Sequence, residues 1–524
     1  MVELIKRNIH MNRWKGSAST QVTLDDDFIV PDTMDDLARI VISSGDIQVE
    51  SVKNQGEKVL VKGRLVFQVL YRREEGGLQT MAGSMPFEEP VNMPGLEEKD
   101  YLSVSWELED FRTEMINSRK LSVKAVITLQ VRAESLYDVE AAEDAVVTGE
   151  EGGAAVETRR QESEAAAIAV RRKDTCRIRE TICLPASKPE VERVLWSELR
   201  LRDASARPMD GQVHAEGKLE LFMLYESGED GAPAQWLEES IPFSGDVELA
   251  ESTQDRIPSI SLRLVHKEAE AKPDADGEMR ELEVDAVLEL DIRLYEEQPL
   301  QLLTDLYALD RELETDMGQV CFDRLLAVNT GECRIAEKIQ LEKQNRVLQI
   351  CHADGMIKID ETEPQKDSLL ISGVLEASFL YLTSDDEEPV RSVSEAIPFQ
   401  YTADAPGIGP DSVYQLNTGV KQLSAVMAGA DTVELRAVLS LDILVLQPVC
   451  GPVIRGVREL PPDMEKLQRM PGITGYVVQP EDTLWDIAKK FHTIREQVMA
   501  FNGMEQEEVR AGDRLILIKQ LPAS

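Results

Sequence analysis

The 524-residue sequence predicts a mainly β protein with some α: three β-rich, sandwich-like repeats in tandem, followed by a small βααβ domain. Three observations support this class. A motif that begins with glycine and ends with tyrosine occurs three times. Apolar and polar residues alternate in the segments around it, and helical periodicity with clear start and stop signals is confined to roughly the last 50 residues.

Three copies of one pattern run through most of the chain. The Gly-to-Tyr motif spans residues 63–71, 217–225 and 373–381, so successive copies start 154 and 156 residues apart. An apolar-Pro-Phe triplet follows at 85–87, 241–243 and 397–399, and an alternating run centred on alanine follows at 121–127, 282–288 and 433–439. Period-two alternation is typical of half-buried strands. We therefore expect β-rich repeats at residues 1–139, 173–300 and 331–447.

The recurring residues indicate packing rather than chemistry. The glycine predicts a bulge or a close backbone approach, and the proline of each triplet predicts an edge strand or a strand start. The tyrosine is interpreted as an aromatic that closes the core. No reactive side chain recurs at one position of the repeats.

The segments between the repeats differ in composition. Residues 140–172 are rich in Ala, Glu and Gly, which predicts an acidic linker with some helical tendency. Residues 301–330 carry leucines at helical spacing, which predicts a helical connector. Residues 448–474 hold five prolines, which predicts an extended spacer.

Charge and cysteine content exclude several classes. Lys and Arg number 57 against 97 Asp and Glu, a net charge of −40, which disfavours binding to nucleic acid or to an anionic membrane surface. The six cysteines form no C-x-x-C pair, so we expect buried, unpaired thiols in a reducing compartment. The N-terminus has no apolar signal region, and no run approaches the roughly 20 apolar residues of a membrane span. The sequence therefore predicts a cytoplasmic protein.

No motif of a catalytic or metal site is present. The chain has no G-x-S-x-G, no phosphate-binding lysine loop and no H-E-x-x-H. The H-x-E at 214–216 has no P-C-x-x-C after it. We expect no catalytic residue, no metal and no cofactor, and hence no enzyme.

The C-terminal segment, residues 475–520, predicts the order β-α-α-β. A short strand at 475–479 is followed by a helix at 482–491, whose apolar residues lie on one stripe and whose start carries the capping box Thr483-x-x-Asp486. A second capping box, Thr493-x-x-Glu496, opens a second helix that stops at Asn502-Gly503. A strand at 515–518 completes the segment.

This segment resembles a LysM domain, through the run from Tyr476 to Phe491, then Asn502-Gly503, then residues 511–515. The resemblance implies a shallow groove that binds N-acetylglucosamine-containing glycan. The residues that would form it are Asp482, Thr483, Leu484, Asn502, Gly503 and Met504. The family usually has glycine where this chain has Glu481, which favours a protein partner instead. Trp485 is then either a core residue or a partly exposed anchor for that partner, and Lys489 and Lys490 would lie at the rim of the docking face.

The triple repeat resembles the domain found in spore coat assembly proteins of endospore-forming bacteria. The resemblance implies a non-enzymatic scaffold in the mother-cell cytosol that helps to anchor the coat at the forespore surface. Its LysM domain would contact the coat-basement ATPase or another coat protein. A peptidoglycan-binding protein of the cell wall or spore cortex is the alternative. A wall hydrolase with a LysM targeting module is a third reading, which no catalytic constellation supports.

Overall fold

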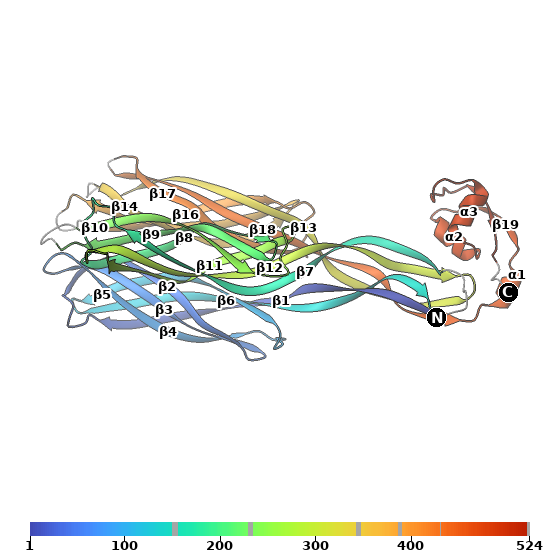
Figure 1. Ribbon diagram of the computed structural model, residues 1–524, viewed down its shortest axis with the longest axis horizontal. Coiled ribbons are helices and arrows are strands. Elements are labelled where there is room, and N and C mark those ends of the chain that lie inside the picture. Colours follow the sequence, from blue (N-terminus) through green and yellow to red (C-terminus); the bar gives the residue numbers. More distant parts are fainter. Residues whose placement is uncertain (149–155, 229–233, 342–346, 386–389, 430, 521–524) are drawn as a thin grey trace.

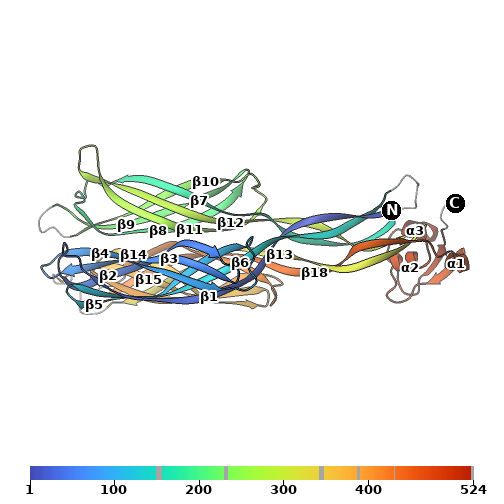
Figure 2. The ribbon, with the colours of Figure 1, turned by 90° about the horizontal axis from the view of Figure 1, so that it is seen from below.

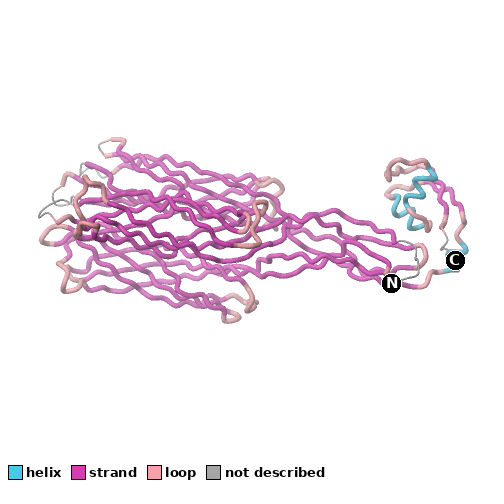
Figure 3. The backbone as a smooth tube through the Cα atoms, in the orientation of Figure 1, coloured by secondary structure: helices cyan, strands magenta, loops and turns pink. Residues whose placement is uncertain are grey.

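The computed structural model describes residues 1–148, 156–228, 234–341, 347–385, 390–429 and 431–520. The molecule is elongated (Figures 1 and 2). A broad head of strands narrows into a stalk, and a small C-terminal domain lies beyond the stalk tip, near the N-terminus. In the described part of the chain, strands make up almost all of the head and stalk, and the helices lie at the C-terminal end (Figure 3). The predicted class, mainly β with some α, is confirmed.

The head and stalk are built from three units of six strands each. Unit 1 contains β1 (Val2–Ile29), β2 (Leu37–Asn54), β3 (Lys58–Arg73), β4 (Leu78–Asn92), β5 (Tyr101–Asn117) and β6 (Lys120–Val147). Unit 2 contains β7 (Val156–Cys183), β8 (Arg193–Met209), β9 (Gln212–Glu226), β10 (Gln235–Glu248), β11 (Ile257–Pro273) and β12 (Met279–Ala308). Unit 3 contains β13 (Glu312–Gln340), β14 (Val347–Gln365), β15 (Ser368–Thr383), β16 (Val390–Asp404), β17 (Val413–Met427) and β18 (Thr432–Leu460).

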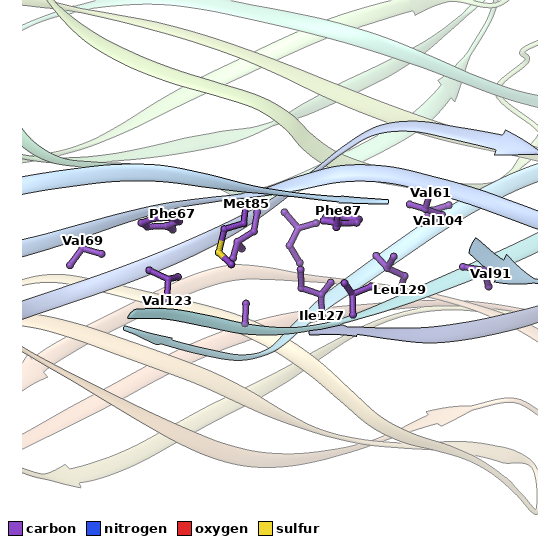
Figure 4. Packing of buried hydrophobic residues seen from close by; sticks show 14 of the residues in the cluster. Val61, Phe67, Val69, Met85, Phe87, Val91, Val104, Val123, Ile127 and Leu129 are labelled. Carbon is purple, nitrogen blue, oxygen red and sulfur yellow. The ribbon is translucent and has the colours of Figure 1, made fainter. Parts of the chain in front are cut away.

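Each unit folds into two antiparallel three-stranded sheets. In unit 1 the sheets have the orders β1-β6-β5 and β2-β3-β4, and the other two units repeat this topology. One hydrophobic core takes residues from both sheets of a unit. Figure 4 shows this core in unit 1, where Phe67 and Phe87 of one sheet lie opposite Val123 and Ile127 of the other.

The recurring glycine packs beneath the recurring phenylalanine. Gly63 is paired in register with Phe87, and a Cβ added to Gly63 would lie 2.6 Å from the Gln48 carbonyl oxygen and 2.7 Å from the Phe87 ring. The neighbouring strand shifts register beside this glycine in all three units. Both predicted roles of the glycine, a bulge and a close approach, are therefore present. The Pro-Phe triplets lie on β4, β10 and β16, which are edge strands as predicted.

The stalk is formed by the first and last strands of each unit, which are the longest strands of the chain. In the sheets β1-β6-β5, β7-β12-β11 and β13-β18-β17, the pairing of the short strand β5, β11 or β17 reaches only as far as Glu134, Tyr295 or Leu446 of the central strand. Beyond these points the two long strands of each unit continue as a two-stranded ribbon. The three ribbons share one core, which includes Ala141, Ala165 and Leu302.

Two expectations for the segments between repeats are therefore wrong. Residues 140–172 are not a linker but the end of β6 and the start of β7, apart from residues 149–155, which lie outside the described residues. Residues 301–330 are not a helical connector but parts of β12 and β13. The alanines suggested a helix because their propensity is high, yet their small side chains are what allows three ribbons to converge on a narrow core.

The proline-rich segment is also mostly different from the expected spacer. Strand β18 continues to Leu460 and pairs with β13 through Pro448 and Pro452. Because β18 has a single neighbour in the stalk, its other edge tolerates residues without an N–H group. A short helix, α1 (Met464–Arg469), then leads to the C-terminal domain.

One pair of cysteines departs from the expectation of unpaired thiols. Cys321 on β13 and Cys450 on β18 are register partners and form a disulfide, with Cα atoms 4.1 Å apart. Both cysteines lie on the exposed side of the stalk. Of the four free cysteines only Cys351 is buried. Sequence spacing cannot show this pairing, because 129 residues separate the two positions and only the strand register joins them.

The C-terminal domain contains β19 (Ile473–Val477), α2 (Leu484–Lys490), α3 (Arg495–Asn502) and β20 (Arg514–Ile518) in that order. Thr483 caps α2 as predicted, and Gly503 ends α3 in the left-handed conformation. The second capping box is wrong: Ile494 occupies the cap position of α3, and Thr493 is buried. No helix within the described residues is long and apolar enough to cross a membrane.

Candidate functional site

The first loop of the predicted groove is held by Asp482. Its carboxylate accepts hydrogen bonds from the Tyr476 hydroxyl at 2.7 Å and from the Gln479 N–H at 2.8 Å. These two bonds lower the pKa of Asp482. The preceding residue, Glu481, has a φ of +72°, a left-handed conformation that favours glycine. The left-handed backbone at this turn explains why the family usually has glycine here. In this chain the same position carries the charged side chain of Glu481.

The second loop of the groove is held by Asn502. Its side-chain amide donates to the Val498 and Ile516 carbonyls at 2.7 and 2.9 Å, and its oxygen accepts from the Ile516 N–H at 2.7 Å. Asn502 therefore ties α3 to β20. Gly503 is exposed with a φ of +63°, and Met504 packs partly against the domain core.

One of the predicted groove residues is buried. Leu484 lies in the domain core. The Thr483 hydroxyl caps α2, although its side chain stays partly exposed. The other predicted residues also keep part of their surface open to solvent: Asp482, Asn502, Gly503 and Met504. The geometry of the loops thus leaves a smaller accessible groove than the sequence pattern indicates.

Trp485 and Lys489 contact the stalk tip of the same chain. The Trp485 indole N–H and the Lys489 ammonium both donate to the Asp305 carboxylate, at 2.7 and 2.6 Å. The Tyr307 ring packs edge-on against Trp485, with centroids 5.0 Å apart, and the Tyr307 hydroxyl donates to the Thr493 carbonyl at 2.9 Å. The end of β12 therefore covers the face of α2 that we predicted to anchor a partner.

Further contacts extend this junction. A His492 ring nitrogen lies 2.7 Å from the Leu309 carbonyl oxygen, and Arg495 lies 3.8 Å from the Glu157 carboxylate on β7. Tyr307 and Leu309 belong to the hydrophobic core of the C-terminal domain although they lie some 165 residues or more before it. Burial raises the pKa of the Tyr307 hydroxyl well above its usual range, so it stays a hydrogen-bond donor.

Lys490 contacts residues of the C-terminal domain itself rather than the stalk. Its ammonium is 5.3 Å from the centre of the Tyr476 ring, a cation–π contact beside Asp482. The two neighbouring lysines therefore make different contacts. Lys489 binds the stalk, and Lys490 borders the predicted groove.

The outer face of the two-stranded sheet is mostly apolar and open. In the register of β19 and β20, Gly475 is paired with Ile516, so Ile473, Val477 and Ile516 share the face that points away from the domain core. These three side chains are 68%, 49% and 53% exposed. Arg514, the register partner of Val477, is the charged residue on this face. We call this surface the outer sheet face.

Sequence reasoning missed both the junction and the outer sheet face. Asp305, Tyr307 and Leu309 lie in the segment that was expected to be a helix, so nothing in their spacing pointed to the C-terminal domain. The outer sheet face had a usable signal: Val477, Ile516 and Ile518 alternate with inward residues on two short strands, which predicts apolar side chains on both sides of the sheet.

Comparison with known families supports the organisation of the chain. The family described as SipL, SPOCS domain matches residues 36–116, 190–272 and 346–428, which span β2–β5, β8–β11 and β14–β17. The LysM domain family matches residues 476–517. The searches of curated proteins and of solved structures found no match. The chain is therefore built from three SipL SPOCS domains, one in each six-stranded unit, followed by a C-terminal LysM domain.

Proposed function

We propose that the chain is a non-enzymatic scaffold of spore coat assembly that acts in the mother-cell cytosol. Its LysM domain docks to a coat-basement protein, such as the coat-basement ATPase, at the forespore surface. The observation that carries this proposal is the exposed outer sheet face at the far end of a long stalk. The two matched families, both binding or scaffold domains, are consistent with it.

The chemistry of the outer sheet face suits a protein partner. Ile473, Val477 and Ile516 form an apolar strip, and the exposed Arg514, the register partner of Val477, lies at the end of this strip. The centres of protein interfaces are depleted in charge and enriched in such residues. The rest of the chain is strongly acidic, so this strip is a place where a partner can approach without desolvating carboxylates.

The separation of head and LysM domain suits a bridging role. The stalk holds the LysM domain away from the head (Figures 1 and 2), and the junction with Asp305 and Tyr307 fixes it there. One end can therefore dock at the basement layer while the head stays free for other coat proteins.

Binding of the full chain to the purified coat-basement ATPase tests the proposal. Ile516→Arg places a charge at the centre of the outer sheet face and should weaken binding by about tenfold or more. Ile29→Arg, at an even more exposed site in the head, is the control and should bind like the unmodified chain. Equal binding by the unmodified chain and Ile516→Arg would contradict the assignment of this face.

Glycan binding is the second candidate, because the LysM match covers the domain. Its residues would be Asp482, Thr483, Gly503 and Met504. Co-sedimentation with cell-wall sacculi tests it, and Glu481→Gly should leave binding unchanged or improve it by removing a charge from the groove. Failure of both forms to sediment with sacculi would exclude this candidate.

A further inference from the structure

A cavity of about 380 Å³ lies between units 2 and 3 of the head. On one side is the outer face of the sheet β13-β18-β17, and on the other are strands β8 and β11. Asp442 on the central strand β18 lines it, and Thr330 and Asn417 flank Asp442 in register on the two neighbouring strands.

The equivalent seam between units 2 and 1 shows what normally surrounds such a carboxylate. Asp291 lies five residues after the central alanine of its strand, as Asp442 does in unit 3. The buried side chain of Asp291 pairs with Arg171 and Arg293. The same two arginines bind the buried carboxylate of Glu134 in unit 1, at 2.9 and 2.8 Å. Two acids and two bases thus balance each other without solvent.

Unit 3 lacks both of these bases. Seven residues after the central alanine, unit 2 has Arg293 and unit 3 has Leu444. The register partner of Arg293 is Arg171, and the register partner of Leu444 is Val328. The acid is therefore kept while both of its cationic partners are replaced by aliphatic residues.

Two large side chains are also missing from this seam. Arg263 in unit 2 lies over the Trp106 ring of unit 1 at 4.3 Å and fills the seam there. The register position of Arg263 is held by Gly419 in unit 3, and that of Trp106 is held by Leu262 in unit 2. Both Gly419 and Leu262 line the cavity. The cavity is thus the volume left by the missing arginines and tryptophan.

Within the described residues, no base forms an ion pair with the carboxylate that remains. The Oδ1 atom of Asp442 is buried and has no hydrogen-bond partner among the described residues. Burial raises the pKa of Asp442, while Lys421 and Thr330 oppose that rise. Lys421 is itself paired with Glu332 at 3.0 Å. An acceptor buried without a partner is costly, so a donor that reaches it gains free energy.

We propose that this cavity binds a small organic cation with a guanidinium or primary ammonium head group. The Asp442 carboxylate accepts the charged N–H groups, as Asp291 accepts those of Arg171 and Arg293. Leu262 and Leu444 line the same space and can cover an aliphatic chain. Val328, which is 51% exposed, marks the side from which a ligand enters.

Titration of the full chain with agmatine, which carries both head groups, tests the proposal. Calorimetry should show saturable binding, and urea at the same concentration should give none, because it has the shape of guanidinium without its charge. Asp442→Asn should weaken agmatine binding at least about tenfold, since a charge-assisted bond is lost. Asp411→Asn, an exposed acid on the loop before β17, is the matched control and should bind like the unmodified chain.

A second variant keeps the test independent of the acid. Val328→Arg restores the arginine of unit 2 and should occupy the site from within, so that agmatine no longer binds while the melting temperature rises. Absence of saturable binding to the unmodified chain would overturn the proposal. Equal binding by Asp442→Asn or by Val328→Arg would overturn it as well, because the cation would then lie elsewhere.

Discussion

Tyr307→Ala should release the LysM domain from the stalk tip. The Tyr307 side chain is 6% exposed, packs edge-on against Trp485 and donates to the Thr493 carbonyl. It is the largest side chain of the stalk in the core of the LysM domain. Removing it takes away the packing between the two parts and leaves the Thr493 carbonyl without its donor.

The expected magnitude follows from these contacts. Truncating a buried aromatic side chain to alanine costs about 3–5 kcal/mol. Tyr307→Phe keeps the ring and loses the hydroxyl, so it should cost about 1 kcal/mol. The larger cost shifts the docking equilibrium by roughly two to three and a half powers of ten, and the smaller by less than one.

Hydrogen exchange measured peptide by peptide distinguishes the two variants. In Tyr307→Ala, exchange should rise at 302–309 and at 484–495, while 134–147 in the stalk keeps its protection. Tyr307→Phe should stay close to the unmodified chain. Unchanged exchange at 302–309 in Tyr307→Ala would refute the junction, and an equal effect of both variants would refute its attribution to packing.

Three further predictions concern the units themselves. Gly63→Ala should lower the free energy of unfolding by about 1–3 kcal/mol, because its Cβ meets the Gln48 carbonyl and the Phe87 ring. Gly475→Ala, with open space around its Cβ, should change the free energy of unfolding little. Equal urea midpoints for the two variants would contradict this prediction. Burial lowers the pKa of His352, but the nearby Glu198 and Glu238 carboxylates outweigh it and raise the pKa to about 9. The resulting stabilisation, about 3 kcal/mol, should be complete below pH 6.5 and lost as the pH rises through 9; a His352→Asn chain with the same pH profile would argue against it. Arg171→Met should cost about 3–5 kcal/mol, because two buried carboxylates are then left to share the single charge of Arg293, and thermal unfolding at unchanged temperature would disprove that role.

Local patterns in the sequence predicted the strands that lie within each unit. The Gly-to-Tyr motif and the Pro-Phe triplet alternate with period two, and both fall on adjacent strands whose pairing puts Gly63 beneath Phe87. The helices of the LysM domain were equally accessible, because Thr483 and Gly503 carry the capping signals in the sequence itself. The sequence showed that Glu481 replaces the glycine usual in the family, but it could not show that this residue lies in a left-handed turn.

The candidate site was less predictable, because its partners lie far away in the sequence. Trp485 was left open between a core residue and an anchor for a separate protein, and Lys489 was expected at the rim of the docking face, yet both bind Asp305 of the same chain. Asn502 was predicted to line a groove and instead joins α3 to β20 through three hydrogen bonds. No local signal distinguishes a side chain that binds a partner from one that binds a distant strand.

The three repeats, their mainly β character and the LysM domain could be predicted from the sequence, because each depends on spacing within a few tens of residues. The length of the strands could not, because it depends on the packing of the three units. Ala141, Ala165 and Leu302 read as helix-forming residues, but three ribbons converging on one axis make them a β core. The same packing joined Cys321 to Cys450, covered Trp485 with Tyr307 and left Asp442 in a cavity without a base. These features depend on contacts between strands that are far apart in the sequence, and those contacts form only when the three units pack together.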